Sequence, residues 1–515
     1  MLRRRLVWSL VVLLALALGA GGLGERRVLA RPGGGQSFRS SGGSRSSSSG
    51  SRSYSTPSRG SSSYSGSSSS SGSYGSRSSN YSTSSGSSST VYVGTSSGRS
   101  SDGGSLFSLL IILLIVAFII WFFWLRKKKP ERATLSVDKN LQQAGLLALQ
   151  KQDASFDPAA FTARTRTVVA KVNEAWCKGN MGPARRVISD GVYVRFQTQI
   201  GLLKAGGLRN AMADWRVVSA DIMGAQADAM WDTIHVKIVG EARDADVALS
   251  LSEAEAQKKV KSAPLSQYHE VWSFVRRRGK SSKNGVPALE GKCPSCGADL
   301  PLSEVVKCEY CQAVVNSGEH DWVLAEITQP EEWRADPAVG ELPGLEELRA
   351  RDASVSRQEL EDRGSVIFWK WIEARTSGKN TKLLRFCLEP PTDAATASVL
   401  ALDHAKLSQV AVGSAELLGI DSDDTYDHAV IEVVWSASVG GKEPTPFKHA
   451  LTLARSISIV SKRGLSSLDC PVCGGQLANS DDVTCSYCGT ELSGGKHEWA
   501  LESVTAEDVD GDSEE

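Results

Sequence analysis

Cys293-Pro294-Ser295-Cys296 is followed, after eleven intervening residues, by Cys308-Glu309-Tyr310-Cys311. The same arrangement recurs as Cys470-Pro471-Val472-Cys473 followed by Cys485-Ser486-Tyr487-Cys488. Each cysteine lies 177 positions before its counterpart (293 to 470, 296 to 473, 308 to 485, 311 to 488), and His320 and Trp322 are repeated at the same offset as His497 and Trp499. The chain therefore uses one module twice.

Two Cys-x-x-Cys pairs at short spacing are typical of a tetrahedral four-thiolate zinc site. Because four thiolates fill the coordination shell, we expect two structural zinc ions with no open position for water or substrate. Two disulfides per module, or redox pairs, are the alternatives, and a reducing compartment favours zinc over both. His320 and His497 are not needed as ligands. The predicted ligands are Cys293, Cys296, Cys308 and Cys311 in the first cysteine module (residues 291–319), and Cys470, Cys473, Cys485 and Cys488 in the second cysteine module (residues 468–496).

The charge balance bears on possible partners. The 515 residues include 58 basic and 58 acidic side chains, so the formal net charge is zero. The first cysteine module has two lysines against four carboxylates, and the second has one lysine against four. Because surfaces that bind nucleic-acid phosphates are basic, we expect no DNA or RNA partner. The two cysteines outside the modules, Cys177 and Cys387, lie in apolar helical patterns and are expected to be packed core thiols.

The N-terminal quarter has patterns that predict export and membrane insertion. Residues 1–30 have the basic start, apolar core and small-residue exits of a signal peptide, with an uncleaved anchor helix as the alternative. Residues 31–104 are Ser/Gly-rich and are expected to be disordered. Residues 106–125 are apolar, and twenty helical residues at about 1.5 Å each span a bilayer core.

A basic cluster directly after this segment sets the expected orientation. Positive residues stay on the cytoplasmic side, so the C-terminal domains are expected in the cytoplasm and the Ser-rich segment outside. The cluster should also attract anionic lipid headgroups. Its residues are Arg126, Lys127, Lys128 and Lys129.

Two similar domains are predicted after a basic, partly helical linker at residues 126–155. Residues 156–328 contain a helix starting at Phe156-Asp157-Pro158, further helix over 183–212, and strands at 215–223, 231–241, 268–277 and 320–327. The first cysteine module takes the place of the turn between the last two strands. After a linker at 329–353, residues 354–504 repeat the scheme: Ser356 begins a helix, strands follow at 409–418, 426–439, 447–460 and 498–504, and the second cysteine module precedes the last strand. Residues 505–515 form an acidic tail.

Helices followed by a curved four-stranded sheet are the order of the cone-shaped α+β fold typified by nuclear transport factor two. More narrowly, residues 156–327 resemble the Tim44-like domain. The resemblance lies in the helix end Glu174-Ala175-Trp176-Cys177-Lys178-Gly179-Asn180, the strand His269-Glu270-Val271-Trp272-Ser273-Phe274-Val275-Arg276 and the closing Asp321-Trp322-Val323-Leu324. It implies a protein of the bacterial inner (plasma) membrane that binds lipid and partner proteins and has no recognised catalytic residues. The second copy diverges, with Leu451-Thr452-Leu453-Ala454 at the matching strand.

The leading expectation is a membrane-tethered binding protein that is not an enzyme. A cone-shaped sheet leaves an apolar cleft for an acyl chain or a hydrophobic segment, although plain core packing is the alternative for each candidate residue. The candidates are Trp176, Phe196, Trp215, Trp231, Trp272 and Phe274. Two other functions are open: an isomerase-like or dehydratase-like enzyme using Asp232, His235, Tyr268 or His269, and a scaffold whose acidic cysteine modules dock a basic protein.

Overall fold

The computed structural model describes residues 139–301, 305–334, 342–388, 406–460, 464–477 and 479–507. The predicted signal peptide, the Ser/Gly-rich segment, the apolar segment 106–125, the basic cluster and residues 508–515 of the acidic tail lie outside these ranges. Among the residues that the structure describes, none of the helices combines the length and the apolar character needed to cross a bilayer.

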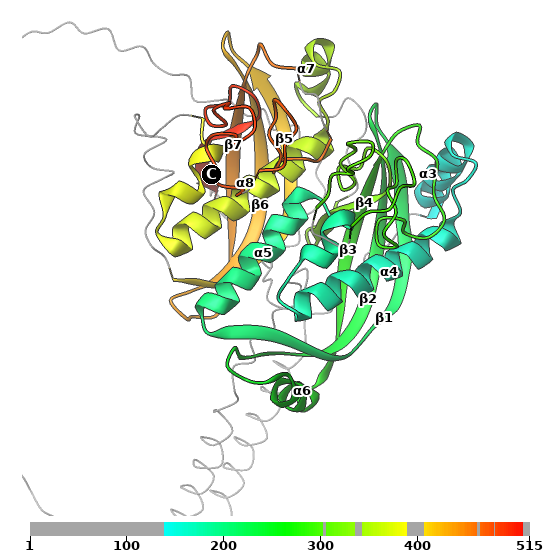
Figure 1. The fold of residues 1–515 in the computed structure, drawn as a ribbon, viewed down its shortest axis with the longest axis vertical. Helices are drawn as coiled ribbons and strands as arrows, with labels where there is room; N and C mark the ends of the chain where they lie inside the picture. Colours follow the sequence, from blue (N-terminus) through cyan, green and yellow to red (C-terminus); the bar gives the residue numbers. More distant parts are fainter. Residues whose placement is uncertain are drawn as a thin grey trace, which may run out of the picture. The chain divides into compact units, whose positions relative to one another are not determined.

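The first half of the described structure (residues 139–328) places helices before an antiparallel sheet with the strand order β1-β2-β3-β4 (Figure 1). Asp157 caps α4 by accepting hydrogen bonds from the backbone N–H groups of Ala159 (3.2 Å) and Ala160 (2.9 Å), and Pro158 occupies the first turn. The elements are α3 (Lys139–Gln152), α4 (Pro158–Cys177), the 3-10 helix η1 (Gly182–Val187), α5 (Asp190–Ala205), β1 (Leu208–Ala227), β2 (Trp231–Ala248), α6 (Glu253–Lys261), β3 (Leu265–Arg277) and β4 (Val323–Thr328).

Three features of this half differ from the sequence-based expectation. The helix predicted over 183–212 is broken by extended backbone at Ile188 and Ser189 and ends at Ala205. The strands β1 and β2 extend well beyond the predicted ranges, β3 begins three residues earlier than predicted, and the unpredicted helix α6 follows β2. Ser252 and Glu255 close α6 with a capping box. The strand extensions are rich in alanine and charged residues, so hydrophobic alternation did not reveal them.

The second half (residues 342–507) has the same order, with the sheet β5-β6-β7-β8. Ser356 caps its long helix, as expected, by accepting a hydrogen bond from Glu359 N at 3.2 Å. The elements are α7 (Leu345–Arg351), α8 (Arg357–Ser377), the 3-10 helices η2 (Asn380–Lys382) and η3 (Leu384–Phe386), β5 (Leu407–Ser422), β6 (Tyr426–Val439), β7 (Thr445–Ser456) and β8 (Ala500–Glu507). Both halves are α+β, and in each the four cysteines lie between the third and fourth strands.

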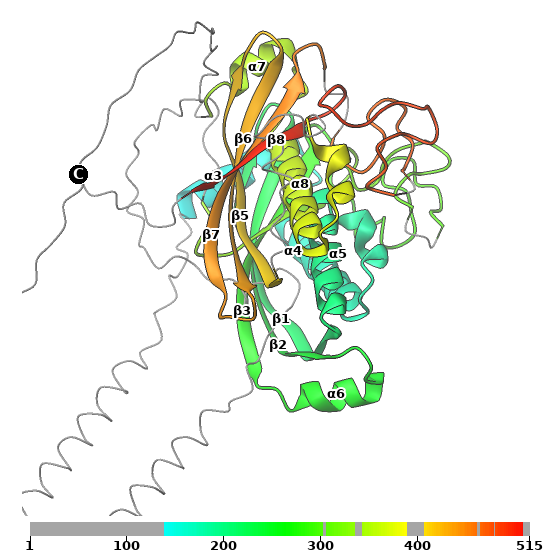
Figure 2. The ribbon, with the colours of Figure 1, turned by 90° about the vertical axis from the view of Figure 1, so that its left-hand side faces the viewer.

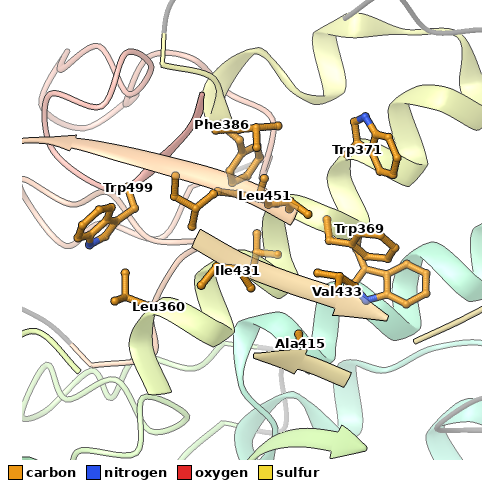
Figure 3. Packing of buried hydrophobic residues seen from close by; sticks show 14 of the residues in the cluster. Leu360, Trp369, Trp371, Phe386, Ala415, Ile431, Val433, Leu451 and Trp499 are labelled. Carbon is orange, nitrogen blue, oxygen red and sulfur yellow. The ribbon is translucent and has the colours of Figure 1, made fainter. Parts of the chain in front are cut away.

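The core of the second half lies between α8 and the sheet (Figure 3). Trp369 is fully buried, and Trp371 packs its ring 6.2 Å from that of Trp435 on β6. Aromatic rings that meet edge to face contribute beyond their buried area. The labelled side chains around them are Leu360, Phe386, Ala415, Ile431, Val433, Leu451 and Trp499.

The two halves pack together through α5 and α8, which lie side by side in Figures 1 and 2. Gly191 on α5 donates its backbone N–H to Asp362 Oδ1 on α8 at 2.9 Å. A Cβ at Gly191 would lie 2.6 Å from the same oxygen, so a larger residue would push the helices apart. The Arg195 guanidinium joins the two sheets by donating to Ile327 O (2.8 Å) and Val412 O (3.2 Å). The two halves therefore bury part of their surface against each other.

Each half contains a buried arginine held between two aspartates. In the first half, Arg276 is 0% exposed and donates to Asp153 (2.9 Å) and Asp232 (3.3 Å), and its guanidinium lies 4.4 Å from the ring centre of Trp322. The second half repeats this arrangement with Arg455, Asp352, Asp427 and Trp499, at 2.8, 3.4 and 4.7 Å. A buried charge is tolerated only when it is paired. Each of these groups of one arginine and two aspartates, an arginine clamp, therefore fixes the end of its sheet to the helix before it.

A surface ion pair on the second sheet predicts a pH dependence of stability. His428 on β6 lies between Glu502 Oε2 (2.9 Å from Nδ1) and Asp423 Oδ2 (3.2 Å from Nε2). The hydrogen bond to Glu502, helped by Asp423, raises the pKa of His428 to about 9. The folded chain thus holds this proton more tightly than the unfolded chain, where the pKa is about 6.5. The resulting stabilisation is complete below about pH 6.5 and is lost as the pH rises through about 9.

We therefore expect His428→Gln to lower the free energy of unfolding by about 1–2 kcal/mol near pH 6 and by little near pH 10. Urea titrations of residues 139–507 and of the variant at the two pH values measure the difference. A cost that is equally large near pH 10 would mean that the shape of the imidazole, and not its charge, matters.

Candidate metal centres and a cavity in the first half

The four cysteines of each module are carried by two tight knuckles of similar backbone geometry. In the first knuckle, Cys293 N donates to Ala298 O and Gly297 N donates to Cys293 O, both at 2.8 Å. The residue after the second cysteine of each knuckle has a positive φ. In the first knuckle of the first module this residue is Gly297 (80°), and in both knuckles of the second module it is also a glycine. In the second knuckle of the first module it is Gln312 (61°). These turns bring the two cysteines of each pair to the same side of the backbone.

The sulfur positions fit a tetrahedral metal ion. Sγ separations are 3.7 Å for Cys293–Cys311 and 3.8 Å for Cys296–Cys308, and the four ligand atoms of each module lie within 4.8 Å of one another. The second module repeats this with 3.7 Å for both Cys470–Cys488 and Cys473–Cys485. Metal–sulfur bonds of about 2.3 Å at tetrahedral angles place sulfurs about 3.8 Å apart, whereas a disulfide needs about 2.05 Å. Both groups can therefore hold a metal ion.

Metal binding at these sites would be coupled to the protonation of the buried sulfurs. Burial raises the pKa of Cys293 and that of Cys470 to about 12, while their partners Cys296 and Cys473 are exposed. A metal ion bound among the sulfurs would displace the protons that these thiols carry at neutral pH, and the protons would pass to solvent. Metal binding should accordingly release protons and should weaken in acid.

Buried arginines attach each module to its half. Arg186 on η1 donates to the carbonyl oxygens of Val305 (3.1 Å) and Pro301 in the first module. At an offset of 199, Arg385 on η3 donates to Ser480 O and Ser467 O (each 3.0 Å) beside the second module. Arginine side chains thus satisfy backbone carbonyls that the small modules leave unpaired. Arg186 and Arg385 are therefore part of the repeat. The sequence did not reveal their role, because nothing local distinguishes them from other basic residues.

The first half contains a cavity of about 700 Å³ between the ends of α4 and α5, the start of β1 and the helix α6. Two of the predicted pocket residues, Trp176 and Trp215, line it. Its other apolar lining residues are Cys177, Ile200, Leu203, Leu208, Met212 and Leu249. A cavity of this size that combines apolar side chains with polar and charged groups is compatible with a small-molecule or acyl-chain site.

Polar contacts fix the position of Trp176. Its indole N–H donates to Asn210 Oδ1 at 2.9 Å, and Asn210 in turn donates to Asp244 Oδ1 at 2.6 Å. Burial and, less strongly, Asp244 raise the pKa of the neighbouring Cys177 to about 12. Cys177 is therefore a neutral thiol at physiological pH, and burial likewise raises the pKa of Cys387 to about 12. Neither cysteine has the thiolate character of a nucleophile.

The other four predicted pocket residues do not line this cavity. Phe196, Trp272 and Phe274 are buried in the main core of the first half, so the core-packing alternative describes them. Trp231 packs in a separate cluster with Leu465 of the second half and donates its indole N–H to Ser356 Oγ at 2.9 Å. Sequence reasoning missed Glu253 and Gln257, which line the cavity from α6, because that helix was not predicted.

The residues considered for acid–base chemistry lie apart. Asp232 is engaged with Arg276, whereas His269 pairs in register with Val239, seven strand positions away from the Asp232 pair. His235 is buried on the opposite face of the sheet from the core, where its Nδ1 lies 2.9 Å from Ser273 Oγ. Tyr268 packs across Gly240. The structure thus does not bring these four side chains to one place.

Comparison with known proteins defines the class of the first domain. Residues 142–285 match the model of the Tim44-like domain, which covers α3 to β3 and ends before the first cysteine module. The resemblance inferred from the sequence is confirmed for this region. No curated protein matches the chain.

Among solved structures, the chain is similar to one described as an "Ntf2 like protein involved in plasmid conjugation". The two share 8% sequence identity over 65% of this chain and 96% of that one, with a TM-score of 0.15, which is too low to support an argument about function.

Proposed function

We propose that this protein is a tethering protein of the bacterial inner membrane, anchored by one span at residues 106–125, that binds an acyl chain or the apolar segment of a partner at its cytoplasmic first domain. The cavity beside Trp176 and Trp215 is the observation that carries this proposal. The Tim44-like domain and the basic cluster after the apolar segment support it.

The charges at the cavity suit an anionic amphiphile. Three cationic side chains, Lys178, Lys204 and Arg209, lie among its lining residues against the two carboxylates of Glu174 and Glu253. Lys178 pairs with Glu174 at 2.6 Å, Arg209 pairs with Glu253 at 3.0 Å, and Lys204 donates to Gly179 O at 3.2 Å. One positive charge is left in excess. An apolar tail inside with a negative headgroup at the rim satisfies both parts of the site.

In this proposal the two metal ions are structural zinc. The Sγ distances suit zinc, four thiolates leave no coordination position for a substrate, and the reducing cytoplasm keeps the cysteines from pairing. Each module is too small to build a stable core of its own, so the metal supplies the folding energy.

A scaffold role for the modules is the second candidate. Tyr310 and Tyr487 occupy equivalent positions in the two modules and are 75% and 70% exposed. Exposed tyrosines at matching places are typical of contact residues in protein interfaces. This role is compatible with the tethering function, since the modules and the cavity lie on different parts of the described structure.

The cavity proposal predicts that filling the space will weaken binding. Leu203→Trp introduces a larger side chain into the lining, and we expect it to weaken binding of a fluorescent fatty acid by about tenfold or more in titrations of residues 139–507. Leu265→Trp, at a position that is 45% exposed and outside the lining, is the matched control and should bind normally. Equal affinity of the two variants, or no binding by the unmodified protein, would contradict the proposed site.

A further inference from the structure

A second site lies where the two cysteine modules meet. Figure 2 shows both modules, green and red-orange, on the same side of the sheets. Lys307 of the first module donates to Gly474 O of the second at 3.2 Å, and Leu465 N donates to Ser317 O at 3.1 Å. A Cβ at Gly464 would lie 2.6 Å from Ser317 O, so glycine permits this close approach. Beside these contacts the modules enclose a cleft of about 430 Å³.

The cleft is lined by groups that recognise anions. Lys307, Arg277 and His320 contribute cationic or N–H donor groups, and Ser354 and Ser466 contribute hydroxyls. Glu319 is the single carboxylate among the lining residues, and it lies 3.6 Å from Arg277. Burial and, less strongly, the positive charge of the nearby Lys280 lower the pKa of His320. The imidazole of His320 therefore contributes an N–H donor to the cleft at pH 7, and not a charge. Two permanent cations therefore face one carboxylate and the sulfur of Cys473, which is a proposed metal ligand.

Comparison of the two copies shows that this positive charge is specific to the first. The residue equivalent to Lys307 is Thr484 at the offset of 177, and the residue that follows the buried arginine is Arg277 in the first copy but Ser456 in the second. The modules are otherwise acidic. The cleft thus gathers basic residues that the repeat itself does not require.

We propose that the cleft between the cysteine modules binds a small molecule bearing a phosphate group. A phosphate has two negative charges and several acceptor oxygens, which match a lysine ammonium, a planar guanidinium and hydroxyl donors. The volume is within the range of small-molecule sites. The phosphate could belong to a soluble metabolite or to a lipid headgroup, and the site uses the same contacts for either. This inference is independent of the function proposed for the apolar cavity.

Calorimetric titration of the full chain, loaded with zinc and held in nanodiscs of neutral lipid, tests the proposal. The probes are adenosine monophosphate, dihexanoyl phosphatidic acid and, as the phosphate-free control, adenosine. We expect at least one phosphate compound to bind and adenosine not to bind. Binding of the nucleotide alone identifies a soluble ligand. Binding of the lipid alone identifies a headgroup in the cleft only if Lys307→Gln weakens it and Leu203→Trp, which fills the apolar cavity, does not.

The variants locate the binding. Lys307→Gln should weaken affinity by about tenfold or more, while Lys307→Arg should largely retain it. Lys292→Gln is the matched control, because Lys292 lies in the same module, pairs with Asp299 at 2.5 Å and does not line the cleft. If Lys307→Gln also loses zinc, Arg277→Gln replaces it as the test. The proposal is overturned if neither phosphate compound binds, if adenosine binds equally, or if Lys292→Gln weakens binding as much as the cleft variants.

Discussion

Replacing Cys308 with serine is expected to release one of the two metal ions and to unfold the first cysteine module. Cys308 is 0% exposed, and its Sγ lies 3.8 Å from that of Cys296 across the proposed metal. The remaining core of the module is small and consists of Cys293, Leu300, Val306 and Val315. Because structural zinc contributes about 10–16 kcal/mol of apparent binding free energy in small modules, the loss cannot be offset by packing. Cys485→Ser should do the same to the second module.

Elemental analysis of protein prepared under reducing conditions measures this effect. We expect two zinc ions per chain in the unmodified protein and one in either variant. Cys387→Ser is the matched control, since Cys387 is also buried but lies outside both cysteine groups, and it should retain two ions. Two ions in the Cys308→Ser variant would show that this cysteine is not a ligand.

The second large effect is expected at the buried arginine clamp. Arg276→Met keeps most of the side-chain volume but leaves Asp153 and Asp232 buried without their partner. Removing one member of a buried ion pair costs about 3–5 kcal/mol, so the free energy of unfolding should fall by about that amount. Arg455→Met should have a similar cost in the second half, because it removes the equivalent contacts to Asp352 and Asp427.

Urea unfolding of residues 139–507 followed by circular dichroism measures both costs. The control is Arg278→Met, two positions further along, where the side chain is exposed and hydrogen-bonds to Gln152 and to Asp228 O. Exposed contacts of this kind contribute about 1 kcal/mol or less. If Arg276→Met costs no more than Arg278→Met, the clamp is not a significant source of stability.

The sequence was most informative where a pattern has one dominant physical cause. The spacing of the eight module cysteines is typical of metal-binding knuckles, so their grouping into two sites that can hold a metal ion could be predicted without a structure. Likewise, a run rich in apolar and β-branched residues identified β6, Tyr426–Val439, with its observed bounds. The order of helices, three strands, module and last strand followed from these signals in both halves.

The rest depends on contacts between distant residues. Asp232 was noted only as a possible acid, because nothing local reveals that Arg276, 44 positions later, would be its partner. Trp231 and Trp272 both lie in predicted strands and could not be told apart from the sequence. In the structure Trp231 packs against the second half and Trp272 lies in the core of the first half, because strand register decides which face of the sheet each side chain occupies. The helix α6 was missed because its nine residues bury only Ala256 and Val260, which is too weak a pattern to stand out.

The proposed binding role is tested most directly by a photocrosslink from the cavity in native membranes. A photoreactive phenylalanine analogue at position 215, in place of Trp215, lies in the cavity lining, and the same analogue at position 265 lies on the exposed surface. The proposed function predicts an adduct with a lipid or with an apolar segment of a membrane protein from position 215, and a much weaker one from position 265. Equal labelling from the two positions, or no adduct at position 215 in protein recovered with its membrane, would contradict it.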